Sequence, residues 1–325
     1  MNLYEGKDIL VTGGVGSIGS ELVRQLVTLN PKKIRVLDQN ESGLFHLQNE
    51  LKEHSNIRYL LGDIRNRERI EKAVKGTDII FHSAALKHVP ACEYDPIEAV
   101  YTNILGTQNI IDSARNEGVD RCIAISTDKA VNPSNTMGAT KLLSEKLMST
   151  ASYAETDTIF SCVRFGNVLR SNGSVIPLFK SQIEQNKPVT VTSETMTRFF
   201  MSLEEAVNLV LEAGVKAKGK EIFILKMKAL KIIDLAQAMI EMSNKEIQIS
   251  VIGKRPGEKE YELLLTEEEA KRTKNEEKIF LLHPEIHTPH YQQDFKQEKP
   301  IAEEEYNSHK ARHLTKEEIK RVLTD

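Results

Sequence analysis

Several features that mark other classes of protein are scarce in this chain of 325 residues. Lys and Arg (44) do not exceed Asp and Glu (47), and the net charge of −3 argues against a nucleic-acid partner. No apolar run is long enough to span a bilayer. The polar start, residues 1–8, lacks the pattern of a signal peptide. We therefore expect a cytoplasmic protein without a membrane segment.

Cysteine and tryptophan are rare as well. The three cysteines, Cys92, Cys122 and Cys162, lie far apart, which excludes a disulfide scaffold and suits a reducing compartment. Neither the cysteines nor the nine histidines show the spacing of metal ligands, so we expect no metal site. Tryptophan is absent, which carries no functional information.

What the chain does contain is an alternation of strand and helix patterns in its first half. Short apolar runs predict strands over 8–12, 34–37, 58–61, 77–81, 122–126 and 159–163. Helical spacing of apolar residues predicts helices over 20–29, 67–74, 97–117 and 138–152. This order predicts an α/β fold with a doubly wound parallel sheet, whose ligands lie at the carboxyl ends of the strands.

The second half has a less regular pattern. Helices are predicted over 202–216 and 232–242, and Thr266 to Glu269 form a capping box that opens a short helix. Residues 284–310 are polar with few apolar anchors, so we expect an extended or poorly ordered segment there. A last helix over 316–323 is expected to pack on the body or on a neighbouring subunit. We thus divide the chain into a dinucleotide-binding domain (1–164), a smaller substrate lobe partly woven into the sheet (165–283), and a tail (284–325).

A glycine motif between the first strand and helix predicts a dinucleotide site of the Rossmann type. Gly13 allows a tight turn, Gly16 lets the backbone approach a pyrophosphate, and Gly19 lets helix and strand pack closely. The helix start at Ser17 and Ile18 then faces the phosphates. The alternative is a glycine turn without a ligand, which the flanking strand and helix make less favourable.

Acids and small residues after the next strands extend this site. Asp38 can bind the adenosine ribose hydroxyls and would repel a 2′-phosphate, which favours NAD, with NADP possible. Its alternative is a turn residue. Asp63, followed by Ile64, can accept a hydrogen bond from the adenine amine, and helix capping is its alternative. Ala84 and Ala85 let the cofactor lie close to the backbone.

A polar segment after the fifth strand carries the chemistry. Thr127, Asp128 and Lys129 follow Ser126, and Met137 stands four residues before Lys141, one helical turn away on the same face. An adjacent acid and base after a strand alone favour a solvated loop pair, and a methionine alone favours core packing. Their combined register favours a catalytic site.

These motifs together carry a family resemblance. The stretches 84–90 and 126–130, Asn103, Met137-x-x-x-Lys141 and residues 164–168 resemble the extended short-chain dehydrogenase/reductases, and more narrowly the UDP-N-acetylglucosamine 4,6-dehydratases of polysaccharide biosynthesis. The resemblance covers about residues 6–283. Related dTDP-glucose dehydratases carry Thr-Asp-Glu where this chain has Thr-Asp-Lys, and 4-epimerases lack the Asp-Lys pair. Many relatives also have an N-terminal membrane domain, and this chain resembles the short form.

The resemblance implies a three-step reaction: hydride removal from sugar C4, loss of water across C5–C6, and hydride return to C6. Thr127 would bind O4, Asp128 would protonate the leaving C6 hydroxyl, and Lys129 would be the base at C5, provided that burial near another cation lowers its pKa. Lys141 would bind the nicotinamide ribose. Met137 replaces the usual tyrosine, so the O4 proton must go to Asp128, to Thr127 through a water, or to Lys129.

The resemblance also implies a nucleotide-sugar site. Lys87 and Asn103 would contact the cofactor, and Lys87 and His88 the sugar, although a structural role for His88 is equally favoured. Further substrate residues would be Asn167, Ser174, Val175, Pro177, Lys180, Arg198, Arg255 and Glu258. The two arginines suit a diphosphate. Arginines outside such a motif are usually solvated.

We expect a homo-oligomeric enzyme that uses NAD and takes UDP-N-acetylglucosamine or a similar UDP-sugar. Two alternatives remain: a UDP-sugar 4-epimerase, against which the Asp128-Lys129 pair argues, and a non-catalytic dinucleotide-sensing protein, which the missing tyrosine motivates. The stereochemistry at C5 and the glycan that is finally made stay open.

Overall fold

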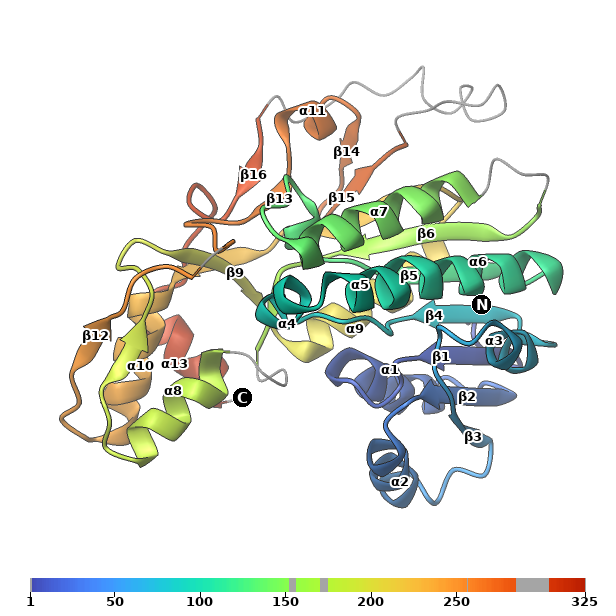
Figure 1. Ribbon diagram of the computed structural model, residues 1–325, viewed down its shortest axis with the longest axis horizontal. Coiled ribbons are helices and arrows are strands. Elements are labelled where there is room, and N and C mark those ends of the chain that lie inside the picture. The colour runs from blue at the N-terminus through green and yellow to red at the C-terminus, as the bar shows by residue number, and fades with distance from the viewer. Residues whose placement is uncertain (1, 152–155, 170–174, 256, 285–303, 325) are drawn as a thin grey trace.

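The computed structural model describes residues 2–151, 156–169, 175–255, 257–284 and 304–324. Figure 1 shows a larger α/β body and a smaller lobe beside it. None of the helices in these ranges is long and apolar enough to cross a membrane.

The larger body is built on a sheet with the strand order β14-β15-β10-β6-β5-β4-β1-β2-β3. Its strands are β1 (Asp8–Thr12), β2 (Lys33–Asp38), β3 (Ile57–Leu61), β4 (Ile79–His82), β5 (Arg121–Ile125), β6 (Ile159–Arg164), β10 (Ile222–Leu225), β14 (Thr273–Asn275) and β15 (Ile279–Leu282). All are parallel except β14 and β15, which form an antiparallel hairpin on β10. The predicted α/β class with a parallel sheet is confirmed.

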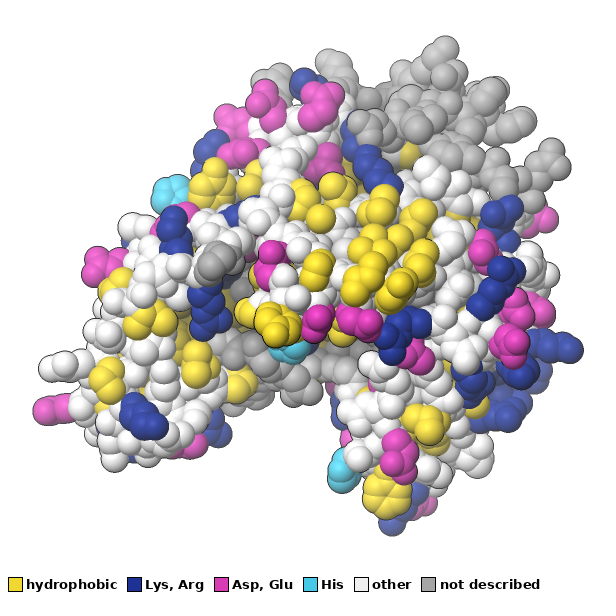
Figure 2. All heavy atoms as spheres, viewed as in Figure 1, with side chains coloured by type: hydrophobic (Ala, Val, Ile, Leu, Met, Phe, Trp, Pro, Cys, Tyr) yellow, Lys and Arg dark blue, Asp and Glu magenta, His cyan; other side chains and the backbone are white. Residues whose placement is uncertain are grey.

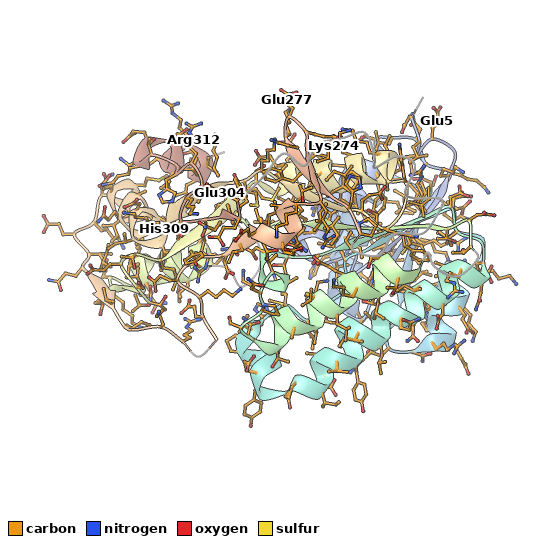
Figure 3. The ribbon with its side chains drawn as sticks, turned by 90° about the horizontal axis from the view of Figure 1, so that it is seen from above. Glu5, Lys274, Glu277, Glu304, His309 and Arg312 are labelled. Atoms are coloured by element: carbon orange, nitrogen blue, oxygen red, sulfur yellow. The ribbon has the colours of Figure 1, made fainter. Side chains whose placement is uncertain are left out.

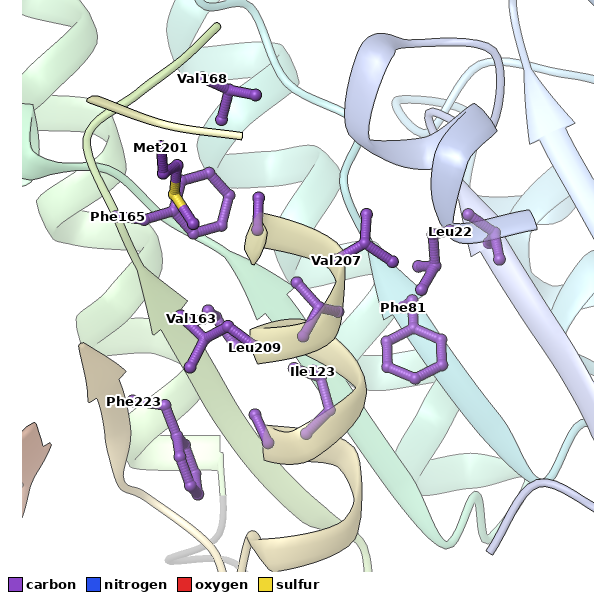
Figure 4. Close-up of a cluster of buried hydrophobic side chains, with 14 of the residues drawn as sticks. Leu22, Phe81, Ile123, Val163, Phe165, Val168, Met201, Val207, Leu209 and Phe223 are labelled. Carbon is purple, nitrogen blue, oxygen red and sulfur yellow. The ribbon is translucent and has the colours of Figure 1, made fainter. Parts of the chain in front are cut away.

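Helices cover both faces of this sheet. One face packs on α1 (Ser17–Val27), α2 (Glu41–Glu50) and α9 (Leu203–Lys216), with the apolar cluster that Figure 4 shows. The other packs on α3 (Arg67–Val74), α6 (Gly106–Asn116) and α7 (Thr136–Ala151). Side chains of a strand alternate between faces, so Ile9 and Val11 enter the first cluster and Leu10 the second. This explains why the strand is a continuous apolar run.

The helix predicted over 97–117 is confirmed, with a π-helical segment inside it and a short helix before it. The structure has α4 (Val89–Tyr94), α5 (Pro96–Ala99) and a π-helical segment (Val100–Leu105) before α6. A π-helical segment widens the turn locally, and the apolar pattern alone does not distinguish it from an α-helix. α2 was not predicted, and for residues 38–41 the sequence offered a turn only as the alternative to ribose binding by Asp38. Asn40 instead caps α2 by accepting a hydrogen bond from Gly43 N at 2.9 Å.

The smaller lobe has its own apolar cluster. It contains α8 (Val175–Glu184), α10 (Ile232–Ser243), α13 (Lys316–Thr324), β8 (Val189–Val191) and β12 (Ile249–Val251). A three-stranded sheet of β7 (Asn167–Val168), β9 (Thr197–Met201) and β11 (Lys228–Lys231) lies between the lobe and the body. Because β10, β14, β15 and α9 belong to the body, the lobe is interleaved with it in sequence. The boundaries at 164 and 283 stay a prediction.

The predicted capping box opens α11 (Glu267–Ala270), and α13 packs on α10 through the buried Ile319. Of the polar segment predicted over 284–310, residues 285–303 lie outside the described residues. The remainder forms β16 (Tyr306–Asn307), which pairs antiparallel with β13 (Leu263–Leu265). In Figure 3, Glu304 and His309 mark this segment where the body meets the lobe. It therefore fixes the residues just before β13.

Apolar side chains also gather on the outer face of α4, α5, the π-helix and α7 (Figure 2). Tyr94 is 86% exposed there, and Ile97, Tyr101, Leu105 and Leu143 are also exposed. The expected homo-oligomer stays a prediction.

Candidate active site

The carboxyl ends of β1, β2, β4 and β5 form one wall of a cavity of about 920 Å³. The opposite wall comes from residues after β6, from β9 and from residues 255–262. Parallel strands place their carboxyl ends at one edge of a sheet, so residues distant in sequence meet here. The sequence predicted this location.

The glycine turn leaves space that a side chain would fill. Gly13 has φ +65°, and a Cβ on it would lie 2.6 Å from Ala84 N. A Cβ on Gly19 would lie 2.1 Å from Gly13 O. Gly16 precedes α1, whose first residues, Ser17 and Ile18, line the cavity with Gly13, Gly16 and Gly19. Close backbone approach and a helix N-terminus are what a pyrophosphate requires, so these residues fit a dinucleotide.

Asp38, Asp63 and Ile64 also line the cavity. The Asp38 carboxylate accepts hydrogen bonds from Val15 N at 3.2 Å and Asn40 N at 3.0 Å, which hold it at the end of β2. Asp63 accepts from Arg65 N at 2.9 Å. Burial raises the pKa of Asp63, but the Arg65 guanidinium outweighs burial and the pKa is lowered. The helix-capping alternative for Asp63 is wrong, because Asn66 caps α3.

The segment after β4 brings Ala84, Ala85, Lys87 and His88 to the cavity. Burial lowers the pKa of Lys87. Asn103, expected to contact the cofactor, is not among the lining residues. Its side chain is buried and bonds Leu86 N at 2.8 Å and Leu86 O at 3.0 Å. The structure thus gives Asn103 a supporting position under this segment.

The catalytic candidates meet after β5. Thr127, Lys129, Met137 and Lys141 line the cavity, and Asp128 lies directly behind them with 0% exposure. Asp128 Oδ1 accepts hydrogen bonds from Thr127 Oγ1 at 2.9 Å and from Lys129 Nζ at 3.0 Å. Asp128 Oδ2 has no hydrogen-bond partner among the described residues. A short 3₁₀ turn, Asp128–Ala130, holds this arrangement.

Lys129 is surrounded by oxygen atoms. Its Nζ donates to Asp128 Oδ1 and, at 3.3 Å, to Asn167 Oδ1, and it lies 3.8 Å from Glu262 Oε1. Burial alone would lower the pKa of Lys129, but Asp128 and Glu262 outweigh it and the pKa is raised. The expected lowering of this pKa is therefore wrong for the site without substrate, because the carboxylates outweigh the neighbouring cation Arg198 as well as burial.

Met137 and Lys141 occupy one face of α7, as their spacing predicts. Met137 is 3% exposed and packs against Cys92 and Ala99 while also lining the cavity. Lys141 Nζ donates to Ile125 O at 2.5 Å, and burial lowers the pKa of Lys141. Met137 thus serves both as core packing and as cavity wall.

On the substrate side, Asn167, Val175, Arg198, Arg255 and Glu258 line the cavity. Pro177 and Lys180 lie on the exposed side of α8 and do not line it, so the structure does not bring them to the site. Ser174 lies outside the described residues.

Arg198 is held rigidly in this wall. Its guanidinium donates to Thr197 O and Lys259 O, both at 2.8 Å, and lies 3.8 Å from both Glu258 and Glu262. Glu258 also accepts a hydrogen bond from Arg255 N at 3.0 Å. A positive charge therefore faces the cavity at a fixed position.

Sequence reasoning missed Glu262. Its side chain lines the cavity between Lys129 and Arg198 and is almost fully buried. Residues 258, 260 and 262 are all glutamates, and nothing in the sequence separates Glu262 from the other two. Pairing of β13 with β16 places it, and no local pattern predicts that pairing.

Residues 9–284 match the sequence model of a family described as "Polysaccharide biosynthesis protein". The chain belongs to this family. A protein of Methanocaldococcus jannaschii named as an uncharacterized membrane protein is 50% identical, over 100% of this chain and 97% of that protein. A UDP-N-acetylglucosamine 4,6-dehydratase (inverting) of Campylobacter jejuni is 40% identical over 90% of this chain and 87% of that enzyme. A UDP-glucose 4-epimerase of Rickettsia felis is 38% identical over 99% of this chain and 96% of that enzyme.

A solved structure supports the same assignment. The crystal structure of Pen from Bacillus thuringiensis is 41% identical, with a TM-score of 0.91 over 99% of each chain. The polysaccharide biosynthesis family thus includes relatives named as nucleotide-sugar dehydratases and as epimerases, and this chain is a nucleotide-sugar dehydratase/epimerase family member.

Proposed function

We propose that this protein is a nucleotide-sugar 4,6-dehydratase that converts UDP-N-acetylglucosamine, or a similar UDP-sugar, to the 4-keto-6-deoxy sugar for surface polysaccharide biosynthesis. The observation that carries the proposal is the Thr127-Asp128-Lys129 cluster at the cavity wall. An epimerase moves hydride at C4 alone and needs no acid–base pair for C5 and C6. A dehydratase needs both.

The cavity supports NAD as the cofactor, with NADP as the alternative. Gly13, Gly16, Gly19 and the start of α1 would hold the pyrophosphate, and Asp38 the adenosine ribose. The Asp38 carboxylate would repel a 2′-phosphate. When bound, the nicotinamide supplies the hydride acceptor for C4 and the hydride donor for C6. Lys141 would bind the nicotinamide ribose.

Among the three acceptors that the sequence left open for the O4 proton, we propose Asp128, reached through Thr127. The Thr127 hydroxyl already donates to Asp128 Oδ1, so it can pass its own proton to Asp128 while accepting one from O4. Met137 has no ionisable group. The same Asp128 proton can then protonate the leaving C6 hydroxyl, which makes the O4 and O6 transfers balance on one residue.

Asp128 Oδ2 is the oxygen left for that second transfer, because it is buried and has no hydrogen-bond partner among the described residues. Gly166 lines the cavity, and a Cβ on it would lie 2.9 Å from Asp128 Oδ2. A side chain at this position would press on the carboxylate, so glycine leaves room for Asp128 directly behind the cavity wall. Lys129 would take the proton from C5, which the C4 ketone acidifies.

The diphosphate and uridine would lie along the opposite wall. Arg198 and Arg255 supply guanidinium groups that match phosphate oxygens, and Glu258 would bind the uridine ribose. Asn167 connects the two halves of the site, because its Oδ1 accepts from Lys129 Nζ.

The test is NMR of UDP-N-acetylglucosamine incubated with the protein and trace NAD⁺. The proposal predicts a new C6 methyl doublet with a hydrated C4 ketone. Accumulation of UDP-N-acetylgalactosamine would instead establish a 4-epimerase, which the relatives so named keep as the second candidate. Lys129→Ala should abolish methyl formation and retain NAD binding. A non-catalytic sensor would show an unchanged spectrum for both proteins.

A further inference from the structure

Glu262 is a buried acid in the cavity wall for which the proposed reaction has assigned no task. Its side chain is 5% exposed, and Oε2 has no hydrogen-bond partner among the described residues. Oε1 lies 3.8 Å from Lys129 Nζ and 3.8 Å from Arg198 Nε. A buried charged carboxylate without hydrogen bonds is costly, so this geometry favours gaining a proton.

Lys129 presents the complementary difficulty. A base at C5 must be neutral, yet Asp128 and Glu262 raise the pKa of Lys129 and so favour its protonated form. Asp128 is the nearest acceptor at 3.0 Å, but in the proposed reaction it has to receive the O4 proton. Another acceptor is needed for the lysine proton.

We propose that Glu262 is this acceptor: it takes the proton from Lys129 when the sugar nucleotide fills the cavity, and returns it when the cycle ends. This inference rests on the proposed dehydratase function. Glu262 acts through Lys129 and is therefore a positioning residue for the proton that makes Lys129 a base.

Binding of the nucleotide sugar would trigger the transfer. The charged groups that face Glu262 are Lys129 and Asp128 after β5, Arg198 on β9, and Lys259. Burial raises the pKa of Glu262; Lys129, Arg198 and Lys259 oppose this shift, while Asp128 adds to it. A diphosphate on Arg198 would neutralise one opposing cation, and the sugar would expel water. Neutralising Arg198 would raise the pKa of Lys129 as well as that of Glu262, so the expulsion of water is the change that favours the neutral Lys129–Glu262 pair over the charged pair.

The protons balance over one turnover. The cycle starts with Asp128 ionised, Lys129 protonated and Glu262 ionised, and the lysine proton moves to Glu262. Asp128 gains the O4 proton and gives it to the leaving C6 hydroxyl, so water departs. Lys129 gains the C5 proton and gives it back to C5 as hydride reaches C6. Glu262 then returns its proton to Lys129, and the starting state is restored.

The experiment compares wild type with Glu262→Gln and Glu262→Asp, with Glu260→Gln as the matched control. Glu260 is on the same segment, but its carboxylate accepts from Ser193 and Thr195 and does not line the cavity. For each protein we would measure kcat from pH 7 to 9 by methyl NMR, and the transient NADH absorbance in a single turnover.

For wild type and Glu260→Gln, kcat should not change from pH 7 to 9, because the proton of Lys129 passes to Glu262 and back without leaving the site. In Glu262→Gln, Lys129 must lose its proton to solvent, so kcat should be low at pH 7 and rise about tenfold per pH unit. NADH should accumulate, since C4 oxidation uses Thr127 and Asp128. Glu262→Asp should recover the flat profile at a reduced rate.

A Glu262→Gln profile parallel to that of wild type, or an unreduced rate at pH 7, would overturn the inference. The inference would also be overturned if Glu262→Gln lost transient NADH and methyl product to the same extent, because this would indicate that Glu262 has only a structural role. If wild type itself makes no methyl product, the dehydratase proposal fails. This failure can be distinguished from failure of the Glu262 proposal, because it is seen in wild type before any variant is compared.

Discussion

Asp128→Asn tests the two tasks that we propose for one buried carboxylate. Asn has the same shape, but it carries no charge and cannot hold the transferred proton. Two charge-assisted hydrogen bonds, from Lys129 Nζ and Thr127 Oγ1, lose their ionic component. Each bond to a charged group contributes about 1.5–3 kcal/mol, and the amide oxygen retains part of this. We therefore expect the free energy of unfolding to fall by about 2 kcal/mol at pH 7.

The pH dependence of that loss has a defined sign. The pKa of Lys129 is raised above its usual value of 10.5, so its stabilising contribution is complete below that value and disappears as the pH rises through the folded-state pKa. Urea denaturation should give a constant difference between wild type and Asp128→Asn from pH 6 to 9. The control is Asp120→Asn, which removes an acid of the surface pair with Lys7. A difference that shrinks within this range would contradict the argument.

Activity should separate Asp128 from Glu262. General acid–base groups contribute about 10²–10⁴-fold, so kcat of Asp128→Asn should fall by that factor. Because the O4 proton then has no acceptor, NADH should not accumulate in a single turnover. Accumulation of NADH in this variant would refute the route through Thr127 to Asp128 and assign the O4 proton to another group.

Three further substitutions test other parts of the site. Gly13→Ala places a Cβ 2.6 Å from Ala84 N at φ +65°, so it should cost at least about 1–2 kcal/mol in urea denaturation and abolish NAD binding in calorimetry. Asp38→Ala should raise the affinity for NADP relative to NAD about fivefold, since two charges a few ångströms apart in water repel by about 1 kcal/mol. Ser308→Ala removes the hydroxyl that accepts from Glu262 N at 3.0 Å; thermal unfolding should show a loss of about 1–3 kcal/mol, and kcat should fall with NAD affinity unchanged.

The parallel sheet could be predicted because each strand is buried on both faces. Residues 9–11 belong to two different apolar clusters, and such strands appear in sequence as short continuous apolar runs. The glycine turn was predictable mainly from its own residues: a Cβ on Gly16 or Gly19 would meet Gly13 O, whereas a Cβ on Gly13 would meet Ala84, which follows β4. The buried strands and the glycine turn can therefore each be identified from a short stretch of sequence.

Other elements depend on distant partners and escaped prediction. α2 begins at residues that also suit a turn, and its packing on β2 and β3 decides the matter. Glu262 resembles its neighbours in sequence and is distinguished only by contacts with Ser308, 46 residues later. The direction of the Lys129 pKa shift could not be predicted from the sequence either. Glu262, which raises this pKa together with Asp128, is far from Lys129 along the chain.

The positions of Asp128, Lys129 and Glu262 explain how the proposed reaction can proceed with a methionine at position 137. A tyrosine there would be an acid on the α7 side of the cavity, beside Lys141, where burial lowers the lysine pKa. In this chain Met137 packs with Cys92 and Ala99, and the ionisable groups in contact with Thr127 and with one another are Asp128, Lys129 and Glu262. Lys129 Nζ lies 3.0 Å from Asp128 Oδ1 and 3.8 Å from Glu262 Oε1, so the three side chains form one connected cluster. Proton movements at O4, C5 and O6 can therefore all be handled by one cluster, and loss of the tyrosine removes a group whose task Asp128 can take over through Thr127.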